Sequence, residues 1–185
     1  MQLEENRLRP DDARSAYALA EWAGFYRGHL GLVPQADMLL SRAEKIVREC
    51  CGLTSPHMEP VLRERAWMAA SEGRAAHIRG LEELRDFRAS VYGSNRRPVE
   101  DSARELAASY AEAGQWPQAA RLYANAVEIC ARRTGGRGFE YVQLLDSIAS
   151  EFATHGDPEM ASTLYQRALD RAERIGFKGE QLESR

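Results

Sequence analysis

The sequence contains no long apolar run, and this absence argues against a protein that spans a membrane. No stretch approaches the ~18 consecutive apolar residues that a transmembrane helix needs. The segment from Met1 to Arg7 also lacks the apolar core of a secretory signal. The chain has 185 residues, 44% of them hydrophobic and 29% charged, as in globular domains that fold in water. We therefore expect one cytoplasmic domain with no membrane partner.

Lysine is nearly absent, since Lys45 and Lys178 are the only two and arginine supplies the other positive charges. The 25 basic residues face 28 acidic ones, which gives a formal net charge of -3. Binding to nucleic acid requires a clustered excess of basic residues, whereas these arginines are interspersed with acids. We expect no nucleic-acid partner. The bias toward arginine, alanine and glycine indicates a GC-rich coding sequence and hence a bacterial source.

Cysteine and histidine are too few and too scattered to indicate a metal site or a disulfide framework. The cysteines are Cys50, Cys51 and Cys130, and no C-x-x-C spacing occurs. None of the four histidines has a second histidine or a cysteine three or four residues away. We expect ordinary thiols, histidines in structural or surface roles, and no bound metal.

Sequence motifs of catalysis are absent as well. We find no nucleophile elbow, phosphate-binding loop or dinucleotide fingerprint. The glycine-rich segment 135–138 lacks the flanking strand and the Lys-Ser/Thr pair of a phosphate loop, so we interpret it as a turn. Adjacent acids such as Glu82 and Glu83 are commoner on solvated helix faces than in acid–base pairs. The sequence predicts no enzyme and no cofactor.

Glycine, in contrast, is present in a regular pattern with a period of 41 or 42 residues. One series is Gly31, Gly73, Gly114 and Gly156, and the other is Gly52, Gly93, Gly135 and Gly176. Because glycine readily adopts the left-handed conformation that ends many helices, each series predicts a set of helix C-termini. We therefore expect four repeats of two helices, at about residues 13–54, 55–96, 97–138 and 139–180.

Prolines lie where these helices should begin, two to five residues after a glycine of either series. They are Pro34, Pro56, Pro98, Pro117 and Pro158. Proline is tolerated in the first turn of a helix, where its missing N–H leaves no bond unmade. Ser55 and Asp157 precede two of these prolines and are predicted N-caps. The signals for helix starts and helix ends therefore agree.

The apolar residues of the third predicted repeat recur 42 residues later in the fourth. The third repeat has Leu106, Ala107, Tyr110, Ala119, Leu122, Tyr123 and Ala126, and the fourth has Ile148, Ala149, Phe152, Ala161, Leu164, Tyr165 and Ala168. Intervals of three and four residues indicate amphipathic helices. We expect the alanines to lie where two helices approach closely, with the aromatic residues filling the space between them.

These residues resemble the tetratricopeptide repeat family, from about Tyr17 to Ile175. The family pattern is a small residue, an aromatic and a glycine in the first helix, then alanine, aromatic and alanine along the second. The period resembles the 42-residue variant found in kinesin light chains and many bacterial proteins. The resemblance implies an all-α, right-handed superhelical solenoid of four repeats, with about eight helices in a single domain.

Two repeats depart from the pattern. The first repeat matches the family pattern only if its second helix is shifted by one residue around residues 28–31. In the second, the alanine positions of the second helix become Ile78 and Arg85. We expect this helix to pack further from its partner or in a shifted register. Its predicted buried stripe is Leu81, Leu84, Phe87 and Val91.

The resemblance also implies a binding groove lined by the first helix of each repeat. The matching positions are Tyr17, Ala20, Arg27, Arg63, Trp67, Ala70, Arg104, Ala108, Glu112, Asp146, Ser150 and Thr154. A tryptophan flanked by guanidinium groups, as Trp67 is by Arg63 and Arg104, can stack on a side chain and bind a carboxylate. This interpretation favours an acidic peptide as partner. In the alternative, Trp67 is a core residue and the arginines pair with Glu64, Glu105 or Asp101.

Three functions follow from this interpretation of the sequence. The first is a non-catalytic scaffold or adaptor that binds a peptide or protein segment in the groove. The second is a structural homo-oligomer that uses the solenoid edge or convex face. Apolar residues of the last repeat, Ile148, Leu164 and Leu169, are expected to be partly uncovered there. A homodimer through this repeat, or a longer repeat array of which this chain is a fragment, would cover them. The third function is a regulatory sensor of a peptide or small ligand.

Overall fold

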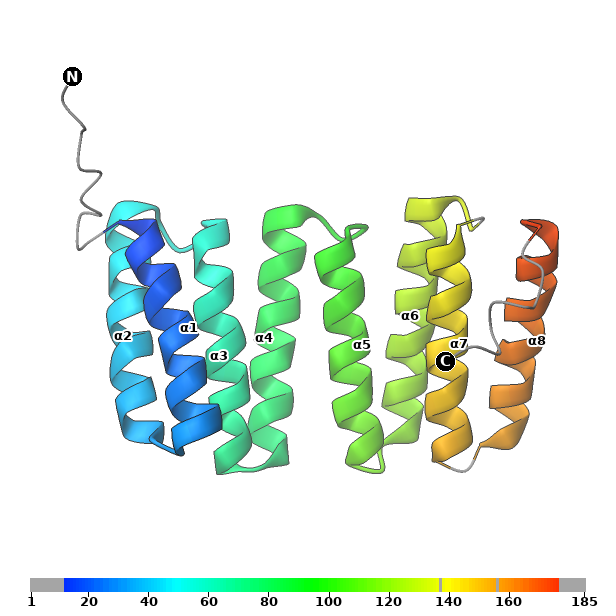
Figure 1. Ribbon diagram of the computed structural model, residues 1–185, viewed down its shortest axis with the longest axis horizontal. Helices are drawn as coiled ribbons and strands as arrows, with labels where there is room; N and C mark the ends of the chain where they lie inside the picture. Colours follow the sequence, from blue (N-terminus) through cyan, green and yellow to red (C-terminus); the bar gives the residue numbers. More distant parts are fainter. Residues whose placement is uncertain (1–11, 137, 156, 177–185) are drawn as a thin grey trace, which may run out of the picture. The chain divides into compact units, whose positions relative to one another are not determined.

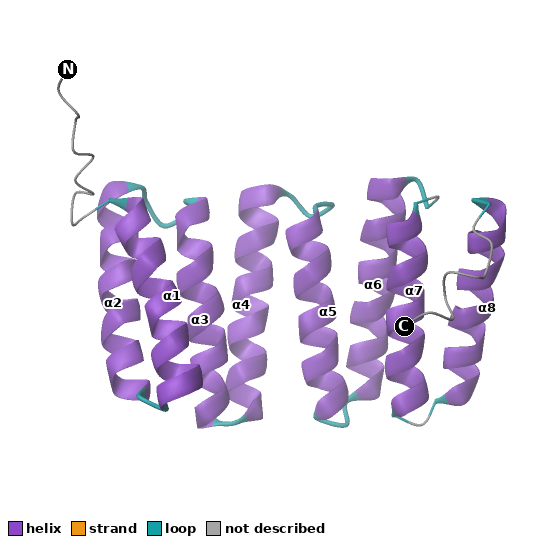
Figure 2. Ribbon diagram, in the orientation of Figure 1, coloured by secondary structure: helices purple, strands orange, loops and turns teal. Residues whose placement is uncertain are grey.

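The computed structural model describes residues 12–136, 138–155 and 157–176, and these form helices joined by short loops (Figures 1 and 2). The described residues contain eight α-helices and two short 3₁₀ helices. They are α1 (Ala13–Leu30), α2 (Val33–Cys50), η1 (Pro56–Met58), α3 (Glu59–Met68), η2 (Ala69–Glu72), α4 (Arg74–Tyr92), α5 (Arg97–Glu112), α6 (Trp116–Thr134), α7 (Phe139–Thr154) and α8 (Pro158–Arg174). The expected all-α fold of paired helices is confirmed. Within the described ranges, no helix has the length and apolar character required to cross a membrane.

The chain divides into two compact units, the first ending at Gly93 and the second beginning at Ser94. In the first unit, α1 packs against α2 and α3, and α3 packs against α4. In the second unit, α5 packs against α6, and α7 packs against both α6 and α8. Each unit has its own apolar core.

The glycines end helices as predicted. All seven glycines of the two series that lie in the described ranges have positive φ, between 66° and 119°, and Gly156 lies outside those ranges. At Gly31 the φ of 66° would strain any other residue, and its N–H caps α1 by donating to the Tyr26 carbonyl. The predicted N-cap Asp157 accepts a hydrogen bond from the Met160 N–H at 2.9 Å.

The predicted alanines are buried where the helices of a pair meet. The buried set includes Ala107, Ala119, Ala126, Ala149, Ala161 and Ala168. Tyr123 is buried beside them, and its ring lies 5.8 Å from that of Phe152. Small side chains let the helix backbones approach, and the aromatic rings fill the remaining volume.

The second repeat has a shifted register and does not have a wider helix spacing. A Cβ atom on Gly80 of α4 would lie 2.7 Å from Cα of Ala66 on α3, so these helices are in close contact. The expectation of a more distant packing is therefore wrong. The positions 42 residues before Ala119, Tyr123 and Ala126 of α6 are His77, Leu81 and Leu84, and all three are buried. Of the expected positions one residue later, Ile78 is buried too, but Arg85 is not.

The predicted buried stripe of this helix is only partly correct. Leu81 and Leu84 are buried, whereas Phe87 and Val91 are half-buried. Arg88 is also buried, because its guanidinium binds Glu59 of α3 at 2.9 Å. A charged side chain therefore occupies part of the face that was expected to be apolar.

The cysteines differ in state. Cys130 is a buried thiol, as expected, and burial raises its pKa. Cys50 and Cys51 are joined in a disulfide between adjacent residues at the end of α2, so the expectation of two separate thiols is wrong.

The contact at Gly80 predicts that Gly80→Ala destabilises the protein by about 1–3 kcal/mol, because the added methyl group overpacks against backbone. Gly28→Ala is the matched control, since a Cβ at that helical position meets nothing within 4 Å. It should stabilise the protein by up to about 1 kcal/mol through helix propensity. Urea denaturation measures both. Equal effects of the two substitutions would contradict the close contact.

Candidate binding surfaces

In the first unit, two of the predicted groove arginines bind a carboxylate of their own chain. Glu64 of α3 is 92% buried and accepts from Arg27 Nη2 of α1 and from Arg63 Nε, each at 3.3 Å. Arg63 Nη2 also donates to Glu21 Oε1 at 2.8 Å. Gly24 makes room for this carboxylate, because a Cβ there would lie 2.8 Å from Glu64 Oε2. The pairing with Glu64 that the alternative interpretation predicted is present.

This pairing limits what Arg63 can offer a partner. Burial alone would lower its pKa, but the hydrogen bond to Glu21 and the charges of Glu64 and Glu21 outweigh burial and raise it. The guanidinium is a permanent cation, and its Nε and Nη2 already donate to carboxylates of the same chain. An acidic peptide would have to displace these carboxylates, and Glu64 would then be left buried and unpaired.

The other predicted residues of the first unit lie at its surface or in its core. Tyr17 is exposed, whereas Ala20 is fully buried and cannot contact a partner. Trp67 is 43% exposed, and its ring lies 4.8 Å from that of His77. His77 is buried and fixed by a 2.7 Å hydrogen bond between its Nδ1 and the Ala66 carbonyl.

In the second unit, Arg104 lines a polar cavity of about 250 Å³ between α5 and α7. Its guanidinium donates to Ser147 Oγ at 3.3 Å. Of the other predicted residues of this unit, Glu112, Asp146, Ser150 and Thr154 are exposed and Ala108 is half-buried. Trp67 belongs to the first unit and Arg104 to the second, so no single unit contains the predicted tryptophan between two arginines.

A partly buried ion-pair network in the second unit was missed in the sequence. Arg133 of α6 donates to Glu100 of α5 at 3.0 Å and to Glu140 of α7 at 2.6 Å. Arg97 also binds Glu140, at 2.9 Å. The sequence does contain a signal for this network, which is an acidic residue in the first turn of α3, α5 and α7. These residues are Glu59, Glu100 and Glu140, spaced 41 and 40 residues apart. Arg88 of α4 binds Glu59, and Arg133 of α6 binds both Glu100 and Glu140.

The network predicts that Arg133→Met destabilises the protein by about 3 kcal/mol, because it leaves the buried Glu100 carboxylate without its cation. Arg132→Met is the matched control. Arg132 is the neighbouring residue and forms an exposed pair with Glu128 on the same helix, so its loss should change stability by less than about 0.5 kcal/mol. Chemical denaturation measures both, and similar losses would show that burial of the network contributes nothing.

The same network predicts a pH dependence. The hydrogen bond from Arg133 outweighs burial and lowers the pKa of Glu140 below its ordinary 4.5. Glu140 therefore stabilises the folded state above that value, and this contribution disappears as the pH falls through the lowered pKa. The stability difference between the natural protein and Glu140→Gln should be largest near pH 7 and should shrink below pH ~4. A difference that is constant from pH 7 to pH 3 would contradict this assignment.

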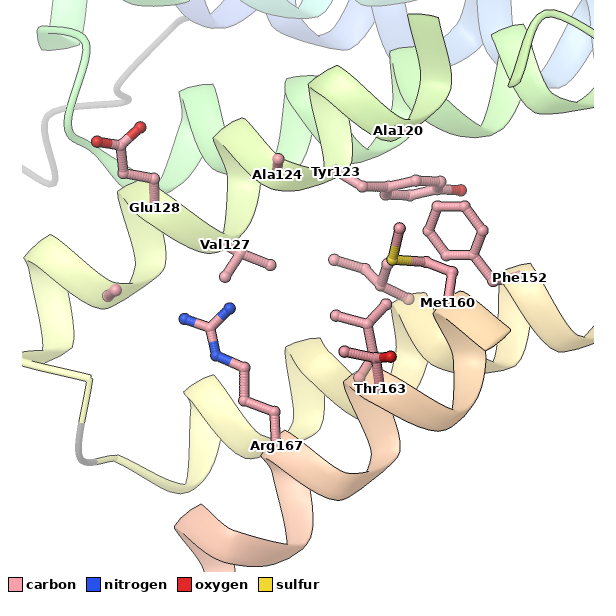
Figure 3. Close-up of a pocket in the computed structure, with 12 residues that line it drawn as sticks. Ala120, Tyr123, Ala124, Val127, Glu128, Phe152, Met160, Thr163 and Arg167 are labelled. Atoms are coloured by element: carbon pink, nitrogen blue, oxygen red, sulfur yellow. The ribbon is translucent and has the colours of Figure 1, made fainter. Parts of the chain in front are cut away.

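The second unit also contains an open apolar groove that the sequence analysis did not locate (Figure 3). It has a volume of about 500 Å³ and lies between α6 and α8, with α7 beneath. Its lining residues are Ala120, Tyr123, Ala124, Val127, Glu128 and Ala131 of α6, Ile148 and Phe152 of α7, and Met160, Thr163, Leu164 and Arg167 of α8. The sequence signal that could have indicated this groove is the helical spacing of Ala120, Ala124 and Ala131 along α6.

The groove has one apolar end and one charged end. Figure 3 shows Tyr123, Phe152 and Met160 together at one end, Arg167 toward the other, and the Glu128 carboxylate directed away from Arg167. The Tyr123 hydroxyl is buried and has no hydrogen-bond partner among the described residues. Burial, with the charge of Glu151, raises its pKa to about 12.

The apolar residues that were expected to be uncovered in the last repeat have different surroundings. Ile148 is buried, so the expectation was wrong for this residue. Leu164 is half-buried in the wall of the groove, and Leu169 is 49% exposed, as expected.

The first unit has an exposed aromatic surface on α1. Trp22 is 57% exposed and Phe25 is 44% exposed, and their ring centroids lie 6.2 Å apart. Phe25 stacks on His29 at 4.9 Å. We call Trp22, Phe25 and His29 the aromatic ridge.

Comparison with known proteins identifies relatives by family and by fold. Residues 99–174 match the model of the tetratricopeptide repeat family. Two crystal structures of a Podosopora anserina protein with nearly identical TPR-like repeats, described as a kinesin light chain, are 20% and 21% identical to this chain. They align with TM-scores of 0.67 and 0.64, covering 94% and 90% of this chain and 81% and 78% of theirs. BtubC (BKLC) from P. vanneervenii is 17% identical, with a TM-score of 0.61 over 88% of this chain and 73% of its own. No curated protein sequence matches significantly.

Proposed function

We propose that this chain, which belongs to the tetratricopeptide repeat family, holds a segment of a partner protein in the apolar groove between α6 and α8. Repeats with this fold generally act as scaffolds for protein–protein interactions. The function is therefore that of a non-catalytic adaptor. The groove itself is the observation that carries the proposal.

The apolar lining supports a binding role. A concave apolar surface left open to water is costly for a soluble protein, and such surfaces commonly mark interaction sites. The floor is formed by Ile148 and Phe152, which also belong to the core of the second unit. A bound side chain would therefore pack against rigid residues that need no rearrangement.

The shape of the groove favours a helical segment. Ala120, Ala124, Val127 and Ala131 follow one another at intervals of four, three and four residues, so they form one stripe along α6. The stripe extends over 12 residues, and its ends lie about 16 Å apart along the helix. Because three of these residues are alanine, a partner helix can approach the α6 backbone closely. The matching partner is an amphipathic helix of about three turns.

The surface formed by the first helices is the weaker candidate for this function. Arg27 and Arg63 are already bound to Glu64, so they are poor recognition groups for an acidic peptide. Arg104 and the exposed Trp67 remain available, but they lie in separate units. The groove, in contrast, is complete within the second unit.

The proposal is tested with helical peptides selected from an amphipathic library for binding to the whole protein. Ala124→Glu places a charge in the groove and should weaken peptide binding at least 10-fold, measured by fluorescence anisotropy. Asn125→Glu is the matched control, because Asn125 is exposed on the same helix and does not line the groove. It should leave affinity unchanged. Circular dichroism checks that both variants remain helical.

Two outcomes would overturn the groove as the site. In one, the selected peptides bind Ala124→Glu as tightly as the natural protein. In the other, Arg104→Glu abolishes binding while Ala124→Glu does not, which would assign the site to the first helices.

A further inference from the structure

We propose that the partner helix is α1 of a second copy of this chain, which inserts its aromatic ridge into the groove. This inference rests on the proposed function, since it names the occupant of the same groove. The ridge lies on the first unit and the groove on the second, so the contact joins two different surfaces of two copies.

The ridge is an unusual surface for a soluble protein. Trp22 and Phe25 are both about half exposed, and their rings are in contact with each other. Contacts from Trp22 to Phe25 and Tyr26, and from Phe25 to His29, hold the rings in place on α1. A preformed ridge loses little side-chain entropy on binding.

The ridge and the groove have matching spacing and opposite shape. Trp22, Phe25 and His29 occur at intervals of three and four residues, with the small residue Ala18 four positions before Trp22. The α6 stripe has the same four-three-four spacing but consists of small side chains. Large side chains on one helix therefore face the space left by alanines on the other, as in ridges-into-grooves packing.

The polar groups of the two surfaces are also compatible. Glu128 at the edge of the groove pairs with Arg132 through one carboxylate oxygen, and its other oxygen can accept a hydrogen bond from the imidazole of His29, which ends the ridge. Trp22 is 57% exposed, and its indole N–H requires a hydrogen-bond partner once the side chain is buried.

A contact between a ridge and a groove joins unlike surfaces, so we propose a head-to-tail assembly. Each copy offers one ridge and one groove, so a contact between two copies leaves one of each unused. The average mass of the natural protein should therefore rise with concentration beyond that of a dimer, or stop at a closed ring.

The test follows the mass of the full chain by light scattering and sedimentation over a 100-fold concentration range. Trp22→Ala with Phe25→Ala removes the ridge, and Ala124→Glu blocks the groove. Each should weaken association at least 10-fold. Tyr17→Ala and Asn125→Glu are the matched controls, because both residues are exposed on the same two helices but lie outside the two surfaces. They should associate as the natural protein does.

Mixing the two defective variants tests the head-to-tail geometry directly. The ridge variant keeps its groove and the groove variant keeps its ridge, so the mixture should form a heterodimer and nothing larger. Absence of that heterodimer would overturn the proposal. So would a natural protein that stays monomeric at every concentration, or association that is lost in Leu169→Glu but retained in Ala124→Glu.

The outcomes separate this inference from the proposed function. If selected peptides bind the groove but the natural protein is monomeric, the second copy is excluded and the groove remains a binding site. If the protein associates but Ala124→Glu affects neither association nor peptide binding, both the binding role of the groove and its occupation by a second copy are contradicted.

Discussion

The close approach of paired helices at small residues is the constraint on which the rest of the structure depends. Ala107 and Ala119 are buried where α5 meets α6. Between α3 and α4, Gly80 lies directly against Ala66. Once the backbones are this close, the larger side chains are directed away from the contact, into the core or toward solvent. Both the partly buried Arg133 network and the open groove lie beside such contacts.

Much of the fold could be predicted from the sequence because its signals are local. A glycine such as Gly31 readily adopts the positive φ that ends a helix, and a proline such as Pro158 is favoured in the first turn, so both mark helix boundaries locally. The register of α4 could not be predicted, because periods of 41 and 42 residues fit the glycines equally well. They differ by the one residue that separates His77 from Ile78.

The candidate sites were harder to predict because they depend on which helices become neighbours. A sequence can show that Arg63 is next to Glu64, but not that Arg27 reaches the same carboxylate from another helix. The groove depends on the space between α6 and α8, and the stripe that contains Ala124 gains a meaning only when that space is known. The surface with the clearest sequence signal, the charged face of the first helices, is the one whose arginines are already paired in the first unit.

The central claim is that the groove between α6 and α8 receives a protein segment. Methyl NMR during titration with a groove-selected helical peptide tests this most directly, because Val127, Ile148 and Leu164 all line the groove. The account predicts that their methyl signals shift with peptide concentration, while those of Val61 in the core of the first unit do not. Unchanged signals from the three groove residues, with shifts confined to residues around Arg104 and Ser147, would contradict it.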